Sequence, residues 1–268
     1  MTTQPTSTGY APVNGLNMYY EIHGDPAAGD GVPLVLLHGA LSATGTSFGG
    51  LLGPLAEGRQ VIAVEQQAHG HTADIDRPLT IAQMAADTVA LLEHIGVAQA
   101  DFFGYSLGAG IAVEIAVQRP SIVRRLVLAS VSINAGGFHP GVLDGIEMLQ
   151  PEMLAGTPFE TEYKEIAPRP EDFAVMVAKV KDLDGRLPEM ADETFAGITA
   201  PTLLVLGDSD IIRPEHAVEL FRLLGGGVAG DNVGLPASRL AILPGTTHVT
   251  VPYQVDALVP MITSFLAG

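Results

Sequence analysis

Short runs of consecutive apolar residues alternate along this chain with longer segments of helical periodicity. The apolar runs span residues 33–39, 60–65, 100–106, 123–130, 200–208 and 238–245, and the helical segments span residues 80–95, 107–118, 214–224 and 251–266. Strands that are apolar on both sides are typical of parallel sheets buried between helices. The pattern therefore predicts an α/β protein with a mostly parallel central sheet and helices on both faces.

Near the start of the chain, strand-like runs at residues 10–13 and 16–23 flank the dipeptide Asn14-Gly15. This dipeptide favours a two-residue hairpin turn, because both of its residues tolerate a positive φ. We therefore expect the hairpin to add an antiparallel edge to the sheet.

One long segment, residues 134–198, interrupts the alternation and holds no clear buried strand. It contains 13 Asp and Glu residues against 5 Lys and Arg residues. We expect a mainly helical insertion that divides the core into residues 1–133 and 199–268. Most of its aromatic and methionine side chains should pack the insertion onto the body, but some are candidates to line a pocket. These pocket candidates are Phe138, Met148, Met153 and Tyr163.

The charge and composition exclude several classes of partner and site. The formal net charge of −17 disfavours nucleic acid and anionic membrane surfaces as partners. The chain has no cysteine, so it has no disulfide, thiolate metal site or cysteine nucleophile. Its first residues are polar and it has no long apolar stretch, so we expect a cytoplasmic protein. The sequence does not indicate an oligomeric state.

A serine bracketed by glycines stands between the apolar run 100–106 and the helical segment that follows it. Gly104-Tyr105-Ser106-Leu107-Gly108 has the Gly-x-Ser-x-Gly pattern of a strained strand-to-helix turn that exposes a nucleophilic serine. Such short strings also arise by chance, but the position between strand and helix favours the functional interpretation. The amide of Leu107, at the helix N-terminus, is then a candidate to stabilise an oxyanion.

A serine nucleophile needs a histidine base and a carboxylate that orients the base. Three histidines follow Ser106: His139, His216 and His248. His139 begins the insertion, and His216 lies early in a helical segment, where a solvated or capping role is ordinary. His248 follows the last apolar run, at the sheet edge where the serine is expected, so it is the candidate base.

The orienting carboxylate should come from the end of the apolar run 200–208, where Asp208 and Asp210 are both within reach. Asp208 is suited to binding local amides in a tight turn, so we favour Asp210. His69 and His71 are two residues apart, but no cluster of carboxylates accompanies them. We therefore interpret them as part of a polar loop, and we predict neither a metal nor a cofactor.

Four short motifs, in this order along the chain, resemble those of the α/β-hydrolase superfamily. They are His38-Gly39, Gly104-Tyr105-Ser106-Leu107-Gly108, Gly207-Asp208-Ser209-Asp210 and Gly245-Thr246-Thr247-His248. The resemblance covers nearly the whole chain, and only residues 134–198 and 224–236 match loosely. It implies that Asp210 is the triad acid and that residues 134–198 form a lid.

The resemblance also implies roles around the first motif. The residue after His-Gly supplies the second oxyanion amide, which is Ala40 here, with Leu41 close by. His38 supports this oxyanion loop and is not catalytic.

The chain departs from the family at a stretch that usually reads Asp-x-Arg-Gly-x-Gly-x-Ser. Glu65, Gln67, Ala68 and Thr72 stand at the positions of the Asp, the Arg, the first Gly and the Ser. We expect the triad to be unaffected but the geometry of this loop to differ.

A serine nucleophile indicates attack on acyl carbons, and relatives that use an aspartate instead are disfavoured. We therefore expect a serine hydrolase of small to medium carboxylic esters, with lactones such as N-acyl-homoserine lactones as a refinement. Alternatives are a cofactor-free perhydrolase of the haloperoxidase type and a hydrolase of carbon–carbon bonds. A lid-gated small-molecule receptor is a more distant alternative.

Overall fold

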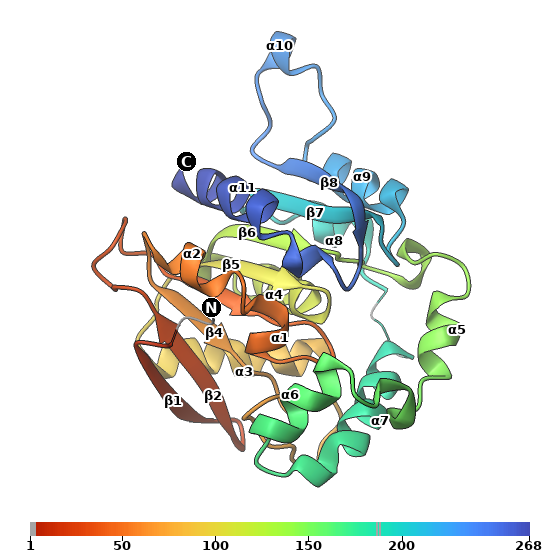
Figure 1. The fold of residues 1–268 in the computed structure, drawn as a ribbon. Coiled ribbons are helices and arrows are strands. Elements are labelled where there is room, and N and C mark those ends of the chain that lie inside the picture. The colour runs from red at the N-terminus through yellow and green to blue at the C-terminus, as the bar shows by residue number, and fades with distance from the viewer. Residues whose placement is uncertain (1–3, 186, 188) are drawn as a thin grey trace.

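The computed structural model describes residues 4–185, 187 and 189–268. These residues form an eight-stranded sheet with the strand order β1-β2-β4-β3-β5-β6-β7-β8 (Figure 1). The strands are β1 (Ser7–Val13), β2 (Leu16–His23), β3 (Leu34–Leu37), β4 (Val61–Val64), β5 (Ala100–Tyr105), β6 (Val123–Ala129), β7 (Thr202–Ser209) and β8 (Arg239–Thr247). β2 pairs with both β1 and β4 in antiparallel fashion, and the other neighbours are parallel. The predicted mostly parallel sheet is therefore confirmed.

Helices cover both faces of this sheet. The α-helices of the described residues are α1 (Thr44–Phe48), α2 (Leu52–Ala56), α3 (Ile81–His94), α4 (Leu107–Gln118), α5 (Val142–Glu147), α6 (Pro158–Ile166), α7 (Phe173–Asp184), α8 (Asp192–Ala196), α9 (Pro214–Leu223), α10 (Gly230–Val233) and α11 (Val255–Ala267), of which α10 lies on a loop that projects away from the sheet (Figure 1). β3 shows the two-sided burial directly, because all four of its side chains are fully buried. Leu34 and Leu36 join the core with α1, α2 and α11, whereas Val35 and Leu37 join the core with α3 and α4.

The hairpin predicted at Asn14-Gly15 joins β1 to β2. Val13 faces Leu16 across the turn, and the turn residues have φ angles of 48° and 84°. These positive φ angles are the reason that Asn and Gly are favoured there. The side-chain amide of Asn14 also donates to Asp87 on α3 (2.9 Å), so the turn is fastened to the helix that packs beneath it.

Residues 134–198, predicted to be mainly helical, contain α5 to α8 and the short 3-10 helices Ala135–Gly137, Pro151–Leu154 and Pro170–Asp172. In Figure 1, α5, α6 and α7 gather at one side of the sheet. α11 continues through Pro260. Among the described residues, the structure contains no helix with the length and apolar composition needed to cross a membrane.

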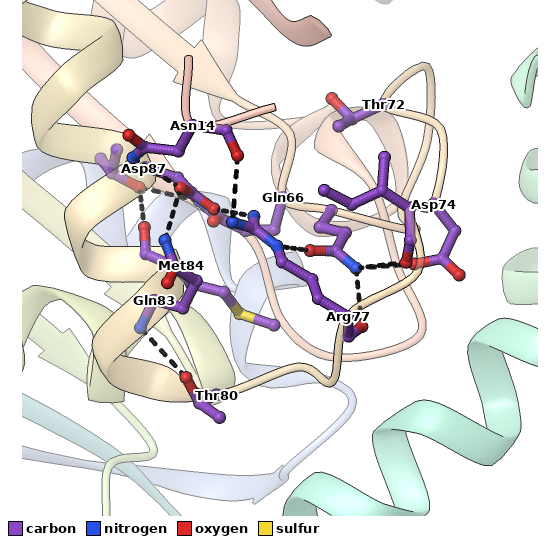
Figure 2. A network of polar contacts seen from close by, with 12 residues as sticks. Asn14, Gln66, Thr72, Asp74, Arg77, Thr80, Gln83, Met84 and Asp87 are labelled. Atoms are coloured by element: carbon purple, nitrogen blue, oxygen red, sulfur yellow. Dashed lines mark hydrogen bonds and ion pairs between the residues drawn. The ribbon is translucent and has the colours of Figure 1, made fainter. Parts of the chain in front are cut away.

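The loop that departs from the family pattern keeps Gly70 at a φ of 54° and is held by side-chain hydrogen bonds. Gln67, at the family's Arg position, binds Asp74 and the carbonyls of Ile75 and Arg77. Arg77 in turn reaches both Gln67 and the buried carboxylate of Asp87 (Figure 2). The loop is therefore joined to α3 by an arginine–carboxylate pair.

Two further replacements complete this loop. Thr72 donates its hydroxyl to the carbonyl of Glu65 (2.8 Å) and accepts the amide of Tyr19 (2.9 Å). Ala68 stands where relatives have Gly and keeps a φ of 65°. Lys179 of α7 then donates to Asp74 and to two carbonyls of the same loop, so the loop anchors residues 134–198 to the core.

The turn between β5 and α4 depends on two close backbone approaches. A Cβ on Gly108 would lie 1.9 Å from the carbonyl oxygen of Leu37, and a Cβ on Gly104 would lie 2.3 Å from that of Gly108. Neither backbone neighbour can move away without shifting β3 or α4. The helix therefore starts directly against the sheet. Ser106, midway between these two glycines, lies in the tight turn that this arrangement requires and has a φ of 53°.

Replacing Gly108 with Ala should destabilise the protein by about 3 kcal/mol or more, because the new methyl overpacks against backbone. Gly110→Ala is the matched control on the same helix, since its Cβ would meet only Ile81 Cδ1 at an ordinary 3.5 Å. This control should be neutral or stabilising by up to about 1 kcal/mol, because Ala favours helix. Urea unfolding measures both variants, and equal stabilities would contradict the close approach.

Candidate active site

Ser106 occupies the strained turn between β5 and α4. Its φ of 53° and ψ of −116° lie outside the regions that side-chain-bearing residues normally adopt. The turn is held because the Ser106 amide donates to the carbonyl of Ala129 on β6 (2.9 Å). This geometry leaves Ser106 lining a cavity instead of packing in the core.

His248 directly follows the C-terminal end of β8, and Ser106 directly follows the C-terminal end of β5. The Nε2 atom of His248 lies 3.0 Å from Ser106 Oγ, and its Nδ1 lies 2.7 Å from Asp210 Oδ1. The hydroxyl of Tyr105 donates to the carbonyl of His248 (2.9 Å), which fixes the backbone of this loop beside β5. Three side chains that are far apart in the sequence thus form one continuous hydrogen-bonded chain.

Asp210 lies just beyond β7 and is fully enclosed. Its Oδ2 accepts the hydroxyl of Ser130 (2.6 Å), and its Oδ1 accepts the amide of Ile212 (3.2 Å) as well as His248. Burial is the largest influence and raises the pKa of Asp210, but these hydrogen bonds and the His248 charge together hold that pKa below its usual value. The carboxylate therefore stays ionised and can orient the imidazole.

The other candidate acid and histidines lie elsewhere. Asp208 is exposed and accepts the amides of Gly245 (2.9 Å) and Thr246 (3.2 Å), which is the local turn role expected for it. His216 is buried on α9 with its Nε2 3.2 Å from Ser132 Oγ, and His139 is exposed. The structure therefore brings only His248 of these histidines next to Ser106.

Two residues of the cavity wall have backbone amides without an acceptor among the described residues. Ala40 and Leu107 both line the cavity, and neither amide donates to any acceptor among the described residues. The amide of Leu41, by contrast, donates to Nε2 of His69 (3.2 Å), so it is not free. The geometry singles out Ala40 and Leu107 as the pair of free donors beside Ser106.

His38 and His69 brace the loop that carries Ala40. His38 Nδ1 donates to the carbonyl of Gly39 (2.8 Å), and its Nε2 accepts the amide of Gln66 (3.0 Å). Burial lowers the pKa of His38 to about 3 and also lowers that of His69, so both rings are neutral near pH 7. Neutral rings can accept from backbone amides, which is how they position this loop.

His69 and His71 lie in a polar loop, as the sequence predicted. His71 binds the buried carboxylate of Glu65 through its backbone amide (2.6 Å) and its Nδ1 (2.9 Å). The hydrogen bond to Glu65 raises the pKa of His71 above its usual value. Within the described ranges, no group of three His, Cys, Asp or Glu side chains is placed to hold a metal ion.

The cavity above Ser106 has a volume of about 330 Å³. Leu41 and Phe138, two of the predicted pocket residues, line it. Met148 and Met153 do not, because they are 68% and 65% exposed on the outer surface. Tyr163 is buried, but it packs against Phe173 inside residues 134–198, with ring centroids 5.4 Å apart. For these three residues the expectation was wrong.

Sequence reasoning missed Asp184, the last residue of α7, whose side chain lines the cavity. Burial raises the pKa of Asp184 to about 6, and the charge of His248 acts in the opposite direction. No motif marked this residue, because it is one of 13 acidic residues in an insertion without a family pattern. Its importance becomes visible only when α7 is placed over the cavity.

The comparison with known families agrees with this architecture. Residues 32–200 match the family described as alpha/beta hydrolase fold. Because the match covers more than half of the chain, the chain belongs to the α/β-hydrolase family.

Solved structures of similar fold share little sequence identity with this chain. The enol-lactonase from Burkholderia xenovorans LB400 superimposes with a TM-score of 0.69 at 21% identity, covering 97% of this chain and 100% of the lactonase. The carboxylesterase CesB from Bacillus subtilis gives 0.74 at 19% identity, covering 99% of this chain and 93% of CesB. Likeness at these identities shows the fold alone.

Among curated relatives, pyrrolizixenacetamide deacetylase from Xenorhabdus hominickii is 33% identical over 107 residues, which are 40% of each chain. The chain thus spans about two fifths of that relative's length, and a second relative matches over a similar share.

The position of Asp184 predicts a pH-dependent effect on stability. Because its folded pKa is raised from 3.8 to about 6, the folded state binds this proton more tightly than the unfolded state does. Stability is therefore lost as pH rises through this window. Asp184→Asn should raise the free energy of unfolding by about 1–2 kcal/mol at pH 8 and by little at pH 4.5.

Asp182→Asn, at an exposed position on the same helix, provides the control and should change stability by less than about 1 kcal/mol at either pH, because polar contacts of exposed charges contribute little. Urea unfolding at the two pH values measures both variants. An Asp184→Asn protein no more stable than wild type at pH 8 would contradict this account.

Proposed function

We propose that the chain hydrolyses carboxylic esters through a covalent acyl intermediate on Ser106. The single observation that carries this proposal is the hydrogen-bonded chain Ser106–His248–Asp210, with distances of 3.0 Å and 2.7 Å. A serine hydroxyl is a weak nucleophile, and an adjacent oriented base is what activates it.

The geometry supports the following cycle. Nε2 of His248 accepts the Ser106 proton as Oγ attacks the ester carbonyl, and the same nitrogen then protonates the departing alcohol. Water, activated by His248, next attacks the acyl group and releases the acid. Asp210 holds the imidazole in the tautomer with a proton on Nδ1 and stabilises its cation.

The free amides of Ala40 and Leu107 supply the second element of the mechanism. Negative charge develops on the carbonyl oxygen during attack, and preorganised donors lower the energy of that state. Both residues line the same cavity as Ser106, which supports this role. Removal of one such donor typically lowers turnover about 100- to 1000-fold.

The size of the cavity supports small and medium esters as substrates. A volume of about 330 Å³ lies at the lower end of the range for small-molecule sites. A lactone is an internal ester, so the same site can open one.

We propose that residues 134–198, whose side chains form much of the cavity wall, act as the lid. We also propose that the enzyme works in the cytoplasm.

The two aspartates near β7 provide a matched pair of variants. Asp210→Asn should lower kcat for p-nitrophenyl acetate by about 10⁴-fold, because the imidazole then adopts the wrong tautomer. Asp208→Asn should change kcat by less than about threefold, since Asp208 binds the turn amides of Gly245 and Thr246 and the hydroxyl of Ser209, and not His248. Steady-state kinetics of both variants measures these effects. A large loss of kcat in Asp208→Asn together with a small loss in Asp210→Asn would contradict the assignment of Asp210 as the triad acid.

A panel of p-nitrophenyl esters tests the substrate class. Values of kcat/KM should rise from acetate to a medium acyl chain and fall for long chains that exceed the cavity. N-acyl-homoserine lactones and peroxide-dependent perhydrolysis belong in the same panel. If only a lactone or only peroxide supports turnover, that activity replaces simple ester hydrolysis as the function; turnover of none of them contradicts the proposal.

A further inference from the structure

The cavity above Ser106 contains two carboxylates, and the only basic side chain among its described lining residues is the imidazole of His248. Among the described residues that line it, Glu114 and Asp184 are acidic, and none is Lys or Arg. The remaining wall is mainly apolar and includes Leu149, Phe159 and Val180. The cavity is therefore an apolar chamber with a negative potential, and the net charge of −17 reinforces that potential.

Glu114 has a hydrogen-bond partner, whereas Asp184 has none among the described residues. Gln118, one turn further along α4, donates its amide to Glu114. Asp184 makes no hydrogen bond or ion pair with any described residue. It is also the last residue of α7, where the helix dipole disfavours an anion.

A carboxylate in this position does not stabilise the fold. Burial without a hydrogen-bond donor is unfavourable for a charged group, and the raised pKa of Asp184 reflects this. Unsatisfied polar groups that face a cavity are typical of sites where the ligand supplies the missing partner.

We propose that Asp184 is a specificity-determining residue that selects esters with an apolar body and a protonated amine. The inference rests on the proposed ester hydrolysis, because the same cavity holds Ser106. An ammonium group would donate a charge-assisted hydrogen bond to Asp184. Substrates that carry a carboxylate would meet only like charge in this cavity.

Two isosteric esters test the inference. In 2-(dimethylamino)ethyl butyrate the protonated nitrogen occupies the place of a carbon in 3-methylbutyl butyrate, so the two differ in charge and not in shape. At pH 7 the amine is protonated and Asp184 is mainly ionised. Wild-type protein should favour the ammonium ester in kcat/KM by about 10- to 100-fold, the effect of a hydrogen bond to a charged group.

Asp184→Asn should remove most of this preference and bring the ratio of the two kcat/KM values towards one. The ratio cancels any loss of folded protein, so a poorly folding variant does not mimic the effect. Asp182→Asn removes the same charge from an exposed position on α7 and should keep the wild-type ratio. An unchanged ratio in Asp184→Asn, or a wild-type preference for the neutral ester, would overturn the inference.

Binding to the Ser106→Ala variant separates this inference from the proposed function. Calorimetric titration of this variant should show tighter binding of the ammonium ester, and adding Asp184→Asn should abolish the difference. If wild type hydrolyses neither ester but the binding preference persists, ester hydrolysis fails and the recognition role stands. If wild type hydrolyses both esters equally and binding shows no preference, the recognition role fails and ester hydrolysis stands.

Discussion

The contact between the start of α4 and the sheet is the constraint on which the rest of the site depends. Gly104 and Gly108 allow α4 to begin against the backbone of β3, and Ser106 is held between them at a φ of 53°. The same turn exposes the Leu107 amide at the helix N-terminus. The proposed nucleophile and the proposed oxyanion donor therefore follow from one backbone arrangement, and His248 and Asp210 reach Ser106 from the ends of the neighbouring strands β8 and β7.

Much of this arrangement was predictable because its signals are local. Consecutive apolar residues identified the six strands from β3 to β8, although β8 is an edge strand and most of its residues are exposed or half-buried, and Asn14-Gly15 identified the hairpin turn. In a parallel sheet the carboxyl ends of the strands share one edge, so residues that follow different strands meet there. That rule predicts that Ser106, Asp210 and His248 lie close together. The tendency of aspartate to bind turn amides assigned Asp208 to the local turn and left Asp210 as the partner of His248.

The wall of the cavity was not predictable, because it depends on how residues 134–198 pack. Met148, Met153 and Tyr163 were chosen by side-chain type, but type alone does not say which face of a short helix meets the core. The missing information is the set of long-range contacts between residues 134–198 and the core, of which Lys179 and Glu162 are two examples. Each joins residues 134–198 to the core over more than 100 residues of sequence, Glu162 through the amides of Ala43 and Thr46. Asp184 reaches the cavity only as a result of such contacts.

Covalent labelling with a fluorophosphonate tests the central claim most directly, because the reagent reacts with a serine that a base has activated. The native protein should gain one adduct, and peptide mass spectrometry should locate it on Ser106. An adduct on another residue, or no adduct on folded protein, would show that the hydrogen-bonded chain above the sheet does not activate this hydroxyl.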